Sequence, residues 1–378
     1  MSLASKILLS ISKPAWQMSC SGFVPSDIQN FKDDLGQQLK TAIRFIKRYL
    51  YMLFRRQVSL EEKRIPVSAR RILWINLSAP SLGDALMDTS GRKLLGDRKI
   101  DLLTSEKNSM LFFEDAFFFN VYTKVRDVMM ENSNDPYDLC ILDSFSPRVI
   151  GVKARVCPTT RFVGLYGFLN GYEVHRTLFN FSRIEHLLGL THQSTRPWVV
   201  HHGLGSRVKR LPRGHSHRDR VAIGVGGEWG YRTYANWKQV ILEIVRGNEL
   251  VDICLLGSAN GRALALEILD DPRLMTVPIE NLVGKTSLEQ TAAELRQCKV
   301  YVGADGGLWH LAVGAGLPTV VVFANKALYN EVGNRVGLET HDHPICMTVH
   351  TDKNVNEADP TFVAEKVLTL VYNTRSLN

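Results

Sequence analysis

The sequence predicts an α/β protein built from two parallel-sheet domains and an N-terminal helical extension. Residues 299–324 (KVYVGADGGLWHLAVGAGLPTVVVFA) have the pattern of a strand, a glycine turn, a helix and a second strand, which is a βαβ unit and requires parallel strands. Similar alternations of short β-type runs and longer segments occur on both sides of a basic stretch with proline and glycine at residues 196–219. The length of 378 residues, 45% of them hydrophobic, suits about two domains.

The net charge of +8 indicates an anionic partner, such as a nucleotide sugar, a phosphorylated glycolipid or a membrane surface. Nucleic acid is not expected as a partner, because the basic residues are dispersed and neither a zinc-finger spacing nor an aromatic ribonucleoprotein motif occurs. The six cysteines form no C-x-x-C pair, which indicates reduced thiols and a cytoplasmic location. No uncharged apolar run approaches the ~20 residues of a transmembrane helix, and no secretory signal is recognisable.

Residues 1–69 form the N-terminal extension, whose patterned part is residues 28–56. Apolar residues recur there at helical spacing, which predicts an amphipathic helix. Its second half is basic and holds Lys40, Arg44, Lys47, Arg48, Arg55 and Arg56. Two interpretations remain open. The helix packs on the domain that follows, which we prefer, or it lies on an anionic membrane surface.

The first domain is expected at residues 70–195. Short β-type runs predict strands at residues 71–77, 99–104, 137–143 and 161–165. A helix is expected to begin at Asp84 and to run to about Leu95, where an N-cap role for Asp84 competes with a chemical one. A second helix is expected at residues 183–190, and the aromatic stretch 111–119 is interpreted as a buried helix.

The second domain follows a linker at residues 196–219 and is expected at residues 220–378. Its β-type runs predict strands at residues 220–225 and 251–256, besides the two strands of the βαβ unit. Amphipathic spacing predicts helices at about residues 235–245 and at residues 360–372.

The turn inside the βαβ unit has the chemistry of an anion site. Asp305 is expected as the N-cap of the helix, and Gly306 and Gly307 leave its first N–H groups uncovered. Those groups and the helix dipole favour a phosphate or diphosphate, and His310 faces the same end one turn further on. The alternative is a glycine-bounded turn that serves only as scaffold.

Several motifs then recur in the order that one family uses. They are RIL at residues 71–73, SLGD at 81–84, LVGKTSL at 282–288, DGGLWHLA at 305–312 and GLP at 316–318. In this order they resemble the motifs of the family 9 glycosyltransferases, the heptosyltransferases. The resemblance covers residues 71–372 and implies the GT-B fold, in which two Rossmann-like domains face a cleft.

The resemblance implies an inverting, metal-independent glycosyltransferase of lipopolysaccharide biosynthesis. Its expected donor is ADP-heptose, and its expected acceptor is the lipopolysaccharide core or a related saccharide, an anionic glycolipid among them. Asp84 matches the position of the family's catalytic base. The expected donor-binding residues are Arg232, Thr286, Asp305, Gly306, Gly307 and His310. No cofactor is expected besides the nucleotide-sugar substrate, and the enzyme is expected in the cytoplasm, with residues 28–56 as the optional contact to the inner membrane face.

The chain departs from the family's pattern at the donor site. The family has Ser or Thr where this chain has Gly306, its hydroxyl residues are replaced here by Gly227 and Glu228, and the turn at residues 257–262 lacks an acidic residue. Two alternatives therefore remain. One is the same fold with another nucleotide sugar or a protein acceptor, and the other is a nucleotide-sugar-binding protein with little transferase activity.

A last group of side chains with metal-binding capacity lies near the C-terminus. It consists of His341, His343, Cys346 and His350. The spacing suits a zinc site or an ordinary polar loop. No metal is predicted, because no paired ligand motif lies elsewhere in the chain.

Overall fold

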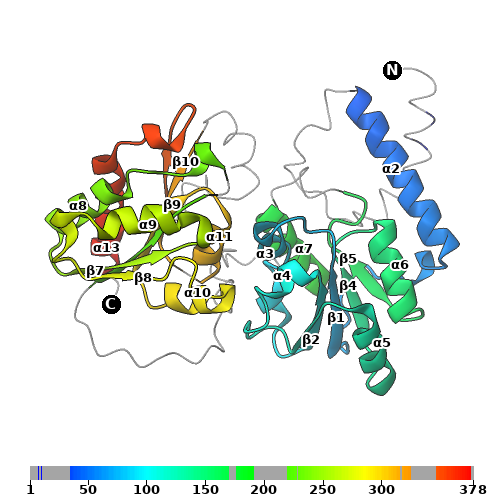
Figure 1. Cartoon of the computed structure of the whole chain (residues 1–378). Coiled ribbons are helices and arrows are strands. Elements are labelled where there is room, and N and C mark those ends of the chain that lie inside the picture. The colour runs from blue at the N-terminus through cyan, green and yellow to red at the C-terminus, as the bar shows by residue number, and fades with distance from the viewer. Residues whose placement is uncertain are drawn as a thin grey trace. The chain divides into compact units, whose positions relative to one another are not determined.

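The structure is a computed structural model, and it describes residues 7, 10, 35–169, 176–190, 219–227, 229–315, 317–324 and 346–375. The chain divides into two compact units (Figure 1), one with residues 1–109 and 117–200 and the other with residues 110–116 and 201–378. The predicted domain limits and the linker at residues 196–219 stay predictions, because residues 191–218 lie outside the described part of the chain.

The first unit contains a five-stranded sheet whose paired strands all run parallel. Its strands are β1 (Arg71–Asn76), β2 (Lys99–Thr104), β3 (Asn120–Tyr122), β4 (Leu139–Leu142) and β5 (Phe162–Gly164), in the order β3-β2-β1-β4-β5. Every residue of β1 and β4 is buried, as expected of a parallel sheet covered on both faces. The four predicted strands are confirmed, and β3 is an additional one.

The helices of the first unit cover this sheet. They are α3 (Leu82–Asp88), α4 (Glu106–Ser109), α5 (Val125–Asn134), α6 (Pro147–Val156) and α7 (Arg176–Leu188), with the 3-10 turns η1 (Val58–Leu60) and η2 (Arg92–Leu95). The helix predicted from Asp84 to Leu95 is wrong in extent, since α3 ends at Asp88. The Thr89 hydroxyl donates back to the carbonyls of Ala85 and Leu86, at 2.9 and 3.2 Å, and such bonds compete with continued helix.

The aromatic stretch 111–119 is not a helix, so this prediction is wrong. Phe112 and Phe118 are buried, whereas Phe113 and Phe119 are 48% and 57% exposed. The Phe119 N–H donates to the carbonyl of Ile100 at 2.7 Å, which draws the end of the stretch into the sheet beside β2. The stretch is therefore a series of turns in which single rings fill separate positions.

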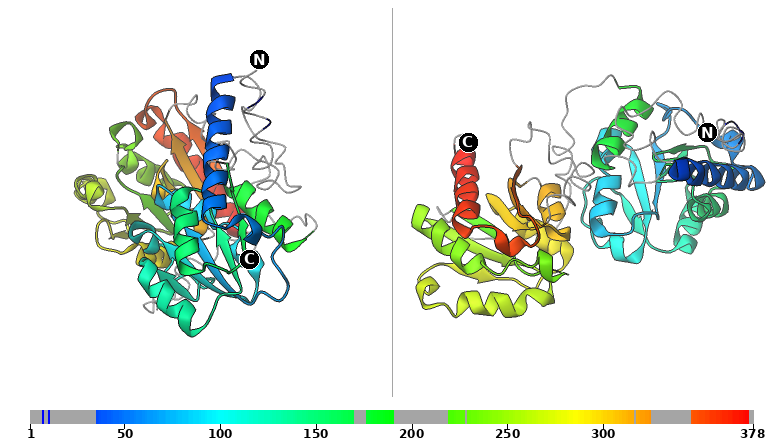
Figure 2. Two further views of the ribbon diagram at one scale, coloured as in Figure 1. Left: turned by 90° about the vertical axis from the view of Figure 1, so that its right-hand side faces the viewer. Right: turned by 90° about the horizontal axis from the view of Figure 1, so that it is seen from above.

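The helix of the N-terminal extension, α2 (Leu35–Phe54), lies beside α6 (Figure 2). Ala42, Phe45 and Met52 are buried, and the Phe45 ring meets Phe168 edge-on with centroids 5.9 Å apart. Arg48 Nη1 lies 3.1–3.2 Å from the carbonyl oxygens of residues 167–169. The preferred interpretation, packing on the first domain, is confirmed for this helix. Residues 28–34 of the predicted helix lie outside the described residues.

The second unit contains a six-stranded parallel sheet. Its strands are β6 (Asp219–Gly224), β7 (Val251–Leu256), β8 (Ile279–Asn281), β9 (Val300–Ala304), β10 (Thr319–Phe323) and β11 (Cys346–His350), in the order β11-β10-β9-β6-β7-β8. The predicted βαβ unit is confirmed, because β9, α11 (Gly307–Gly314) and β10 follow one another and the two strands pair in parallel.

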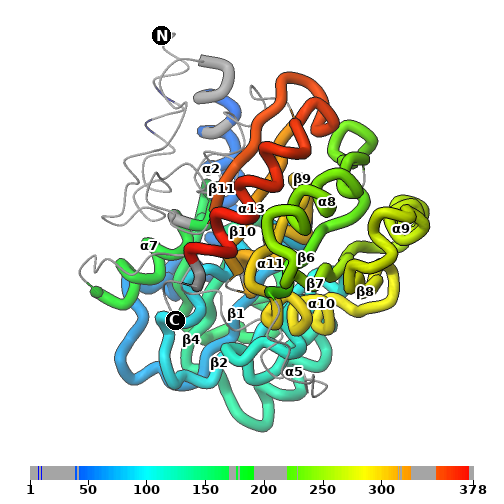
Figure 3. The backbone as a smooth tube through the Cα atoms, turned by 90° about the vertical axis from the view of Figure 1, so that its left-hand side faces the viewer, coloured from blue at the N-terminus to red at the C-terminus, as the bar shows by residue number. Residues whose placement is uncertain are grey.

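The remaining helices of the second unit are α8 (Trp237–Gly247), α9 (Arg262–Leu269), α10 (Leu288–Leu295) and α13 (Pro360–Arg375), with the 3-10 turns η5 (Gly230–Arg232), η6 (Ala259–Gly261), η7 (Pro272–Leu274) and η8 (Val355–Glu357). The C-terminal helix α13 packs beside α8 and against β9 and β10 (Figure 3). The Tyr234 hydroxyl donates to the carbonyl of Ala358 at 3.0 Å, which joins the start of α8 to the segment before α13. Among the described helices, none is both long and apolar enough to cross a bilayer.

Candidate functional site

The second sheet has a topological switch point between β6 and β9. These two strands are neighbours, and the sheet continues from β6 toward β7 and from β9 toward β10. In open parallel sheets, ligands bind outside the carboxyl ends of the strands at such a point. Residues 225–227 leave the end of β6, Arg232 follows in the 3-10 turn η5, and residues 305–306 leave the end of β9. The fold therefore brings two of the predicted donor-binding segments to the same edge of the sheet.

Arg232 and Asp305 meet at this switch point. Arg232 Nη1 lies 3.3 Å from Asp305 Oδ2, and the two side chains are 28% and 21% exposed. Asp305 Oδ1 also accepts a bond from Trp309 Nε1 at 3.2 Å. The expected N-cap role of Asp305 is wrong, because Gly306 is the N-cap of α11. The Asp305 N–H still donates to the carbonyl of Val322 at 3.0 Å, so the chain stays on the sheet for one residue longer than the pattern suggests.

Gly306 and Gly307 are glycines that the fold itself does not require. The φ angle of Gly306 is 173°, which is extended backbone open to any residue. Among the described residues, a Cβ at Gly306 would have its nearest neighbour 4.0 Å away, and a Cβ at Gly307 would meet nothing within 4 Å. Gly303, three residues before Gly306 and within β9, is different, since a Cβ there would overlap the Tyr301 hydroxyl. Packing against the described residues therefore does not account for the two glycines before the first N–H groups of α11.

The Tyr301 ring lies beneath this turn and is 1% exposed. A Cβ at Gly224, in β6, would overlap the same Tyr301 hydroxyl as a Cβ at Gly303. Burial, and then the charge of Asp305, raise the pKa of Tyr301 well above its ordinary value. The buried ring therefore packs in one position against the carboxyl ends of β6 and β9.

The other predicted donor residues lie around the same edge of the sheet. His310 stacks on Trp309 with ring centroids 4.1 Å apart, one turn into α11. Thr286 follows the edge strand β8, and its hydroxyl lies 2.8 Å from that of Thr291 in α10. Since β8 stands two strands from β6 in the sheet, Thr286 is placed farther from Arg232 than the glycines are.

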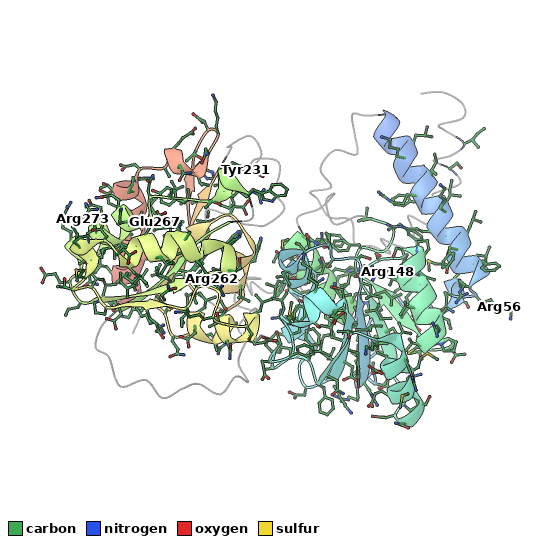
Figure 4. The ribbon with its side chains drawn as sticks, in the orientation of Figure 1. Arg56, Arg148, Tyr231, Arg262, Glu267 and Arg273 are labelled. Carbon is green, nitrogen blue, oxygen red and sulfur yellow. The ribbon has the colours of Figure 1, made fainter. Side chains whose placement is uncertain are left out.

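Asn260 and Arg262 lie in the turn at residues 257–262, which has no acidic residue. Both donate hydrogen bonds to neighbouring loops. Asn260 Nδ2 donates to the carbonyl of Gly227 at 2.9 Å, and Arg262 Nη2 donates to the carbonyl of Gly284 at 3.0 Å. Arg262 stands at the start of α9 (Figure 4). The loops after β6, β7 and β8 are thereby held in one layer. Glu228 lies outside the described residues.

The first unit has its own switch point, between β1 and β4. Asp84 lies beside it in the first turn of α3, with a side chain that is 20% exposed. Ser81, not Asp84, is the N-cap of α3, since its hydroxyl oxygen accepts from the Asp84 N–H at 3.2 Å. The Ser81 hydroxyl also lies 2.6 Å from Asp84 Oδ2 and donates to it. The N-cap alternative for Asp84 is therefore wrong, and its carboxylate instead accepts a bond from the N-cap residue.

A buried polar network lies behind Asp84, and the sequence analysis missed its members. Arg176 Nη1 lies 2.8 Å from Asp84 Oδ1, while Nε and Nη2 of the same guanidinium lie 2.5 and 2.8 Å from the two oxygens of Asp88. Burial, the largest single influence, would lower the pKa of Arg176, but the charges of Asp88, Tyr166 and Asp84 and the bond to Asp88 together raise it above its ordinary value. The spacing of Asp84 and Asp88, one helical turn apart, is the signal that a search for paired carboxylates would find.

Asp143, directly after β4, occupies the same edge of the first sheet. Its Oδ2 accepts from the Ser78 N–H at 2.6 Å and its Oδ1 from the Ser78 hydroxyl at 3.2 Å. The Ser78 hydroxyl also lies 2.8 Å from that of Ser144. Burial, followed by the charge of Asp88, raises the pKa of Asp143 to about 7.

Metal ligation finds little support among the described residues. Cys254, Glu280 and Glu294 have ligand atoms within 4.8 Å of one another. Arg220 Nη2 and Nη1 lie 2.6 and 3.0 Å from the two carboxylates, so a guanidinium already pairs with both of them and offsets part of their charge. Of the C-terminal group, His341 and His343 lie outside the described residues. Cys346 and His350 are the two ends of β11, about 13 Å apart along an extended strand, which is too far for one ion.

Comparison with known proteins supports the family resemblance. The model of glycosyltransferase family 9 (heptosyltransferase) matches residues 191–330, and no curated protein matches the chain significantly. A family 9 glycosyl transferase from Veillonella parvula DSM 2008 has a TM-score of 0.59 at 12% identity, over 82% of this chain and 99% of that one.

Two structures from E. coli are similar to the same extent. The ADP-heptose LPS heptosyltransferase II has a TM-score of 0.56 at 17% identity, over 81% of this chain and 99% of its own. The heptosyltransferase WaaC with ADP has a TM-score of 0.55 at 14% identity, over 79% and 99%. Likeness at such identities shows the fold, and the family model identifies the region that holds Arg232, Asp305 and the two glycines. The chain is a glycosyltransferase with the GT-B fold, and its residues 191–330 match the model of glycosyltransferase family 9.

Proposed function

We propose that this glycosyltransferase is an inverting enzyme that takes a sugar from a nucleotide diphosphate, with ADP-heptose as the first candidate, to a saccharide acceptor of the lipopolysaccharide core. One observation carries the donor side of the proposal. Gly306 and Gly307 leave open space before the N–H groups of α11, although neither packing nor backbone conformation requires a glycine there. A diphosphate is the group that such N–H groups bind best.

The chemistry follows from the two switch points. The Asp84 carboxylate would accept the proton of the acceptor hydroxyl while that oxygen attacks the anomeric carbon. The bond from the anomeric carbon to the diphosphate oxygen breaks with inversion, and the diphosphate leaves with the electron pair. The N–H groups at the start of α11, the Arg232 guanidinium and His310 would stabilise the charge that develops on it. In this proposal protein groups, not a metal ion, hold the leaving group.

In this proposal, Arg232 exchanges its contact with Asp305 for the diphosphate when the donor binds. At 3.3 Å the contact is a loose one, and both side chains remain partly exposed. A diphosphate offers Arg232 stronger, bidentate acceptors than a single carboxylate oxygen. Asp305 keeps its bond from Trp309 and so would remain in place when Arg232 turns toward the donor.

The test is a donor panel followed by a turnover assay. Thermal shifts with ADP-sugars, UDP-sugars and GDP-sugars identify the nucleotide, and release of nucleoside diphosphate from the sugar that binds measures transfer or hydrolysis. A shift with ADP-heptose and release of ADP support the proposal. A shift with another nucleotide sugar indicates the same fold with a different donor. Binding without release indicates a nucleotide-sugar-binding protein.

We also propose that α2 rests on the anionic inner face of a membrane through the side that does not pack. Ile43, Leu50 and Phe54 recur on one helical face at 39%, 56% and 80% exposure, with exposed Lys47 between them. Arg56, also exposed, projects beyond the end of the helix (Figure 4). Apolar side chains flanked by cations match an anionic lipid surface, at ~1 kcal/mol for each basic residue close to it.

A further inference from the structure

We infer that Arg176 is a positioning residue for the catalytic base, and that the buried carboxylate of Asp88 holds it in place. This inference rests on the proposed role of Asp84. All three nitrogens of the Arg176 guanidinium are used, one on Asp84 and two on Asp88. Asp84 and Asp88 stand at i and i+4 of α3, so they share a helical face, and Arg176 reaches both from α7.

Asp88 is built to stay in one orientation. It is fully buried and accepts bonds from the Tyr166 hydroxyl at 2.6 Å and from Asn76 Nδ2 at 3.2 Å, besides the two from Arg176. An isolated carboxylate would be costly there, so the guanidinium is bound as its counter-charge. Three of the five N–H donors of Arg176 are directed at the two carboxylates, and we assign it a role that acts through Asp84.

Asp84 is thereby held from two sides. Oδ1 faces Arg176 at 2.8 Å and Oδ2 accepts from the Ser81 hydroxyl at 2.6 Å, which fixes the rotation of the carboxylate. Each oxygen of an ionised carboxylate has a second lone pair, and the 20% exposure of the side chain leaves it accessible. A base with a fixed orientation reacts faster than one that must find it, and a misplacement of about 1 Å costs on the order of 100-fold in rate.

The same contacts would also brace α3 against α7, so the test must separate positioning from stability. Arg183 provides the matched control. It lies on α7, is 1% exposed and donates through Nε to the carbonyl of Gly164 at 3.0 Å. Arg176→Gln, Asp88→Asn and Arg183→Gln are compared in the full chain with ADP-heptose as donor, by release of ADP and by melting temperature.

We expect Arg176→Gln and Asp88→Asn to lower kcat by roughly 10- to 100-fold while KM for ADP-heptose changes less than about twofold. Arg183→Gln should destabilise the chain comparably and leave kcat within about twofold. If kcat falls in all three variants in proportion to the loss of melting temperature, the network only stabilises the packing of α3 on α7, and the inference is overturned. If Arg176→Gln does not fold, Asp88→Asn decides, because it keeps the shape of the site and removes only the counter-charge.

Asp84→Asn is measured beside these variants. If it loses turnover while Arg176→Gln and Asp88→Asn keep theirs, this inference alone is wrong. If Asp84→Asn keeps full turnover, Asp84 is not the base, and the inference falls together with that part of the proposed function.

Discussion

Replacing Asp143 by Asn should change how the stability of the chain depends on pH. Burial and the charge of Asp88 raise the pKa of Asp143 from 3.8 to about 7, which corresponds to about 4 kcal/mol at 1.36 kcal/mol for each tenfold change in the ionisation constant. Because the folded chain keeps this proton where the unfolded chain has lost it, stability falls as pH rises from about 4 to about 7 and then levels off. Between pH 5 and pH 8 the wild type should lose roughly 2 to 3 kcal/mol through this group.

Asn fits the site, since its oxygen can accept from the Ser78 N–H and its amide can donate to the Ser78 hydroxyl. Denaturant unfolding of both proteins at pH 5 and pH 8 gives the difference between them, in which the titration of other groups cancels. The variant should gain about 2 to 3 kcal/mol relative to the wild type on going from pH 5 to pH 8. Asp138→Asn, at an exposed carboxylate that also accepts backbone N–H bonds, controls for lost hydrogen bonds. Parallel pH dependence of wild type and Asp143→Asn would refute the reasoning.

Four further outcomes are expected. Asp84→Asn should bind ADP-sugars as the wild type does and turn them over ~10²- to 10⁴-fold more slowly; unchanged turnover in an ADP-release assay removes the base assignment. Gly307→Ala should keep stability or raise it by about 0.4 to 1 kcal/mol, since the added methyl meets no described atom within 4 Å. The same variant should weaken ADP binding in calorimetry. A stable variant with unchanged affinity speaks against a diphosphate at this position. Arg232→Ala should weaken ADP binding by about 1.5 to 3 kcal/mol and leave adenosine binding unaffected, and an equal loss for both means that no phosphate contact exists. The double variant of Leu50→Glu and Phe54→Glu should melt like the wild type and lose salt-sensitive sedimentation with anionic vesicles; a wild type that never sediments disproves the membrane contact.

The βαβ unit could be predicted because its signals are local. β-branched runs, a glycine break and helical spacing follow one another within residues 299–324, and each acts on the backbone where it stands. The errors arose where a local signal was missing or was outweighed by tertiary structure. The apolar run at residues 111–119 looks the same whether its rings share a helical face or fill separate positions, and Asp305 stays on the sheet because Val322 offers it a partner.

The network around Asp84 could not be predicted in the same way. Arg176 and Asp84 are 92 positions apart, and nothing in the sequence near either residue indicates the other. The family motif leads to Asp84 alone, since it ends at the first turn of α3. The partners of a site residue come from the packing of helices, which a single sequence does not contain.

The buried Tyr301 ring under the proposed donor site constrains three positions of the chain together. The Tyr301 hydroxyl occupies the space where Gly224 and Gly303 would carry a Cβ, on the two strands that flank the switch point. Phenylalanine at 301 would relieve the hydroxyl contact at position 224 and leave the ring carbon Cζ 3.0 Å from the new Cβ, but at position 303 the same carbon would still lie 2.6 Å away. Alanine at 303 therefore requires a residue smaller than phenylalanine at 301. Among descendants of this sequence, alanine at 224 or 303 should therefore not accompany tyrosine at 301.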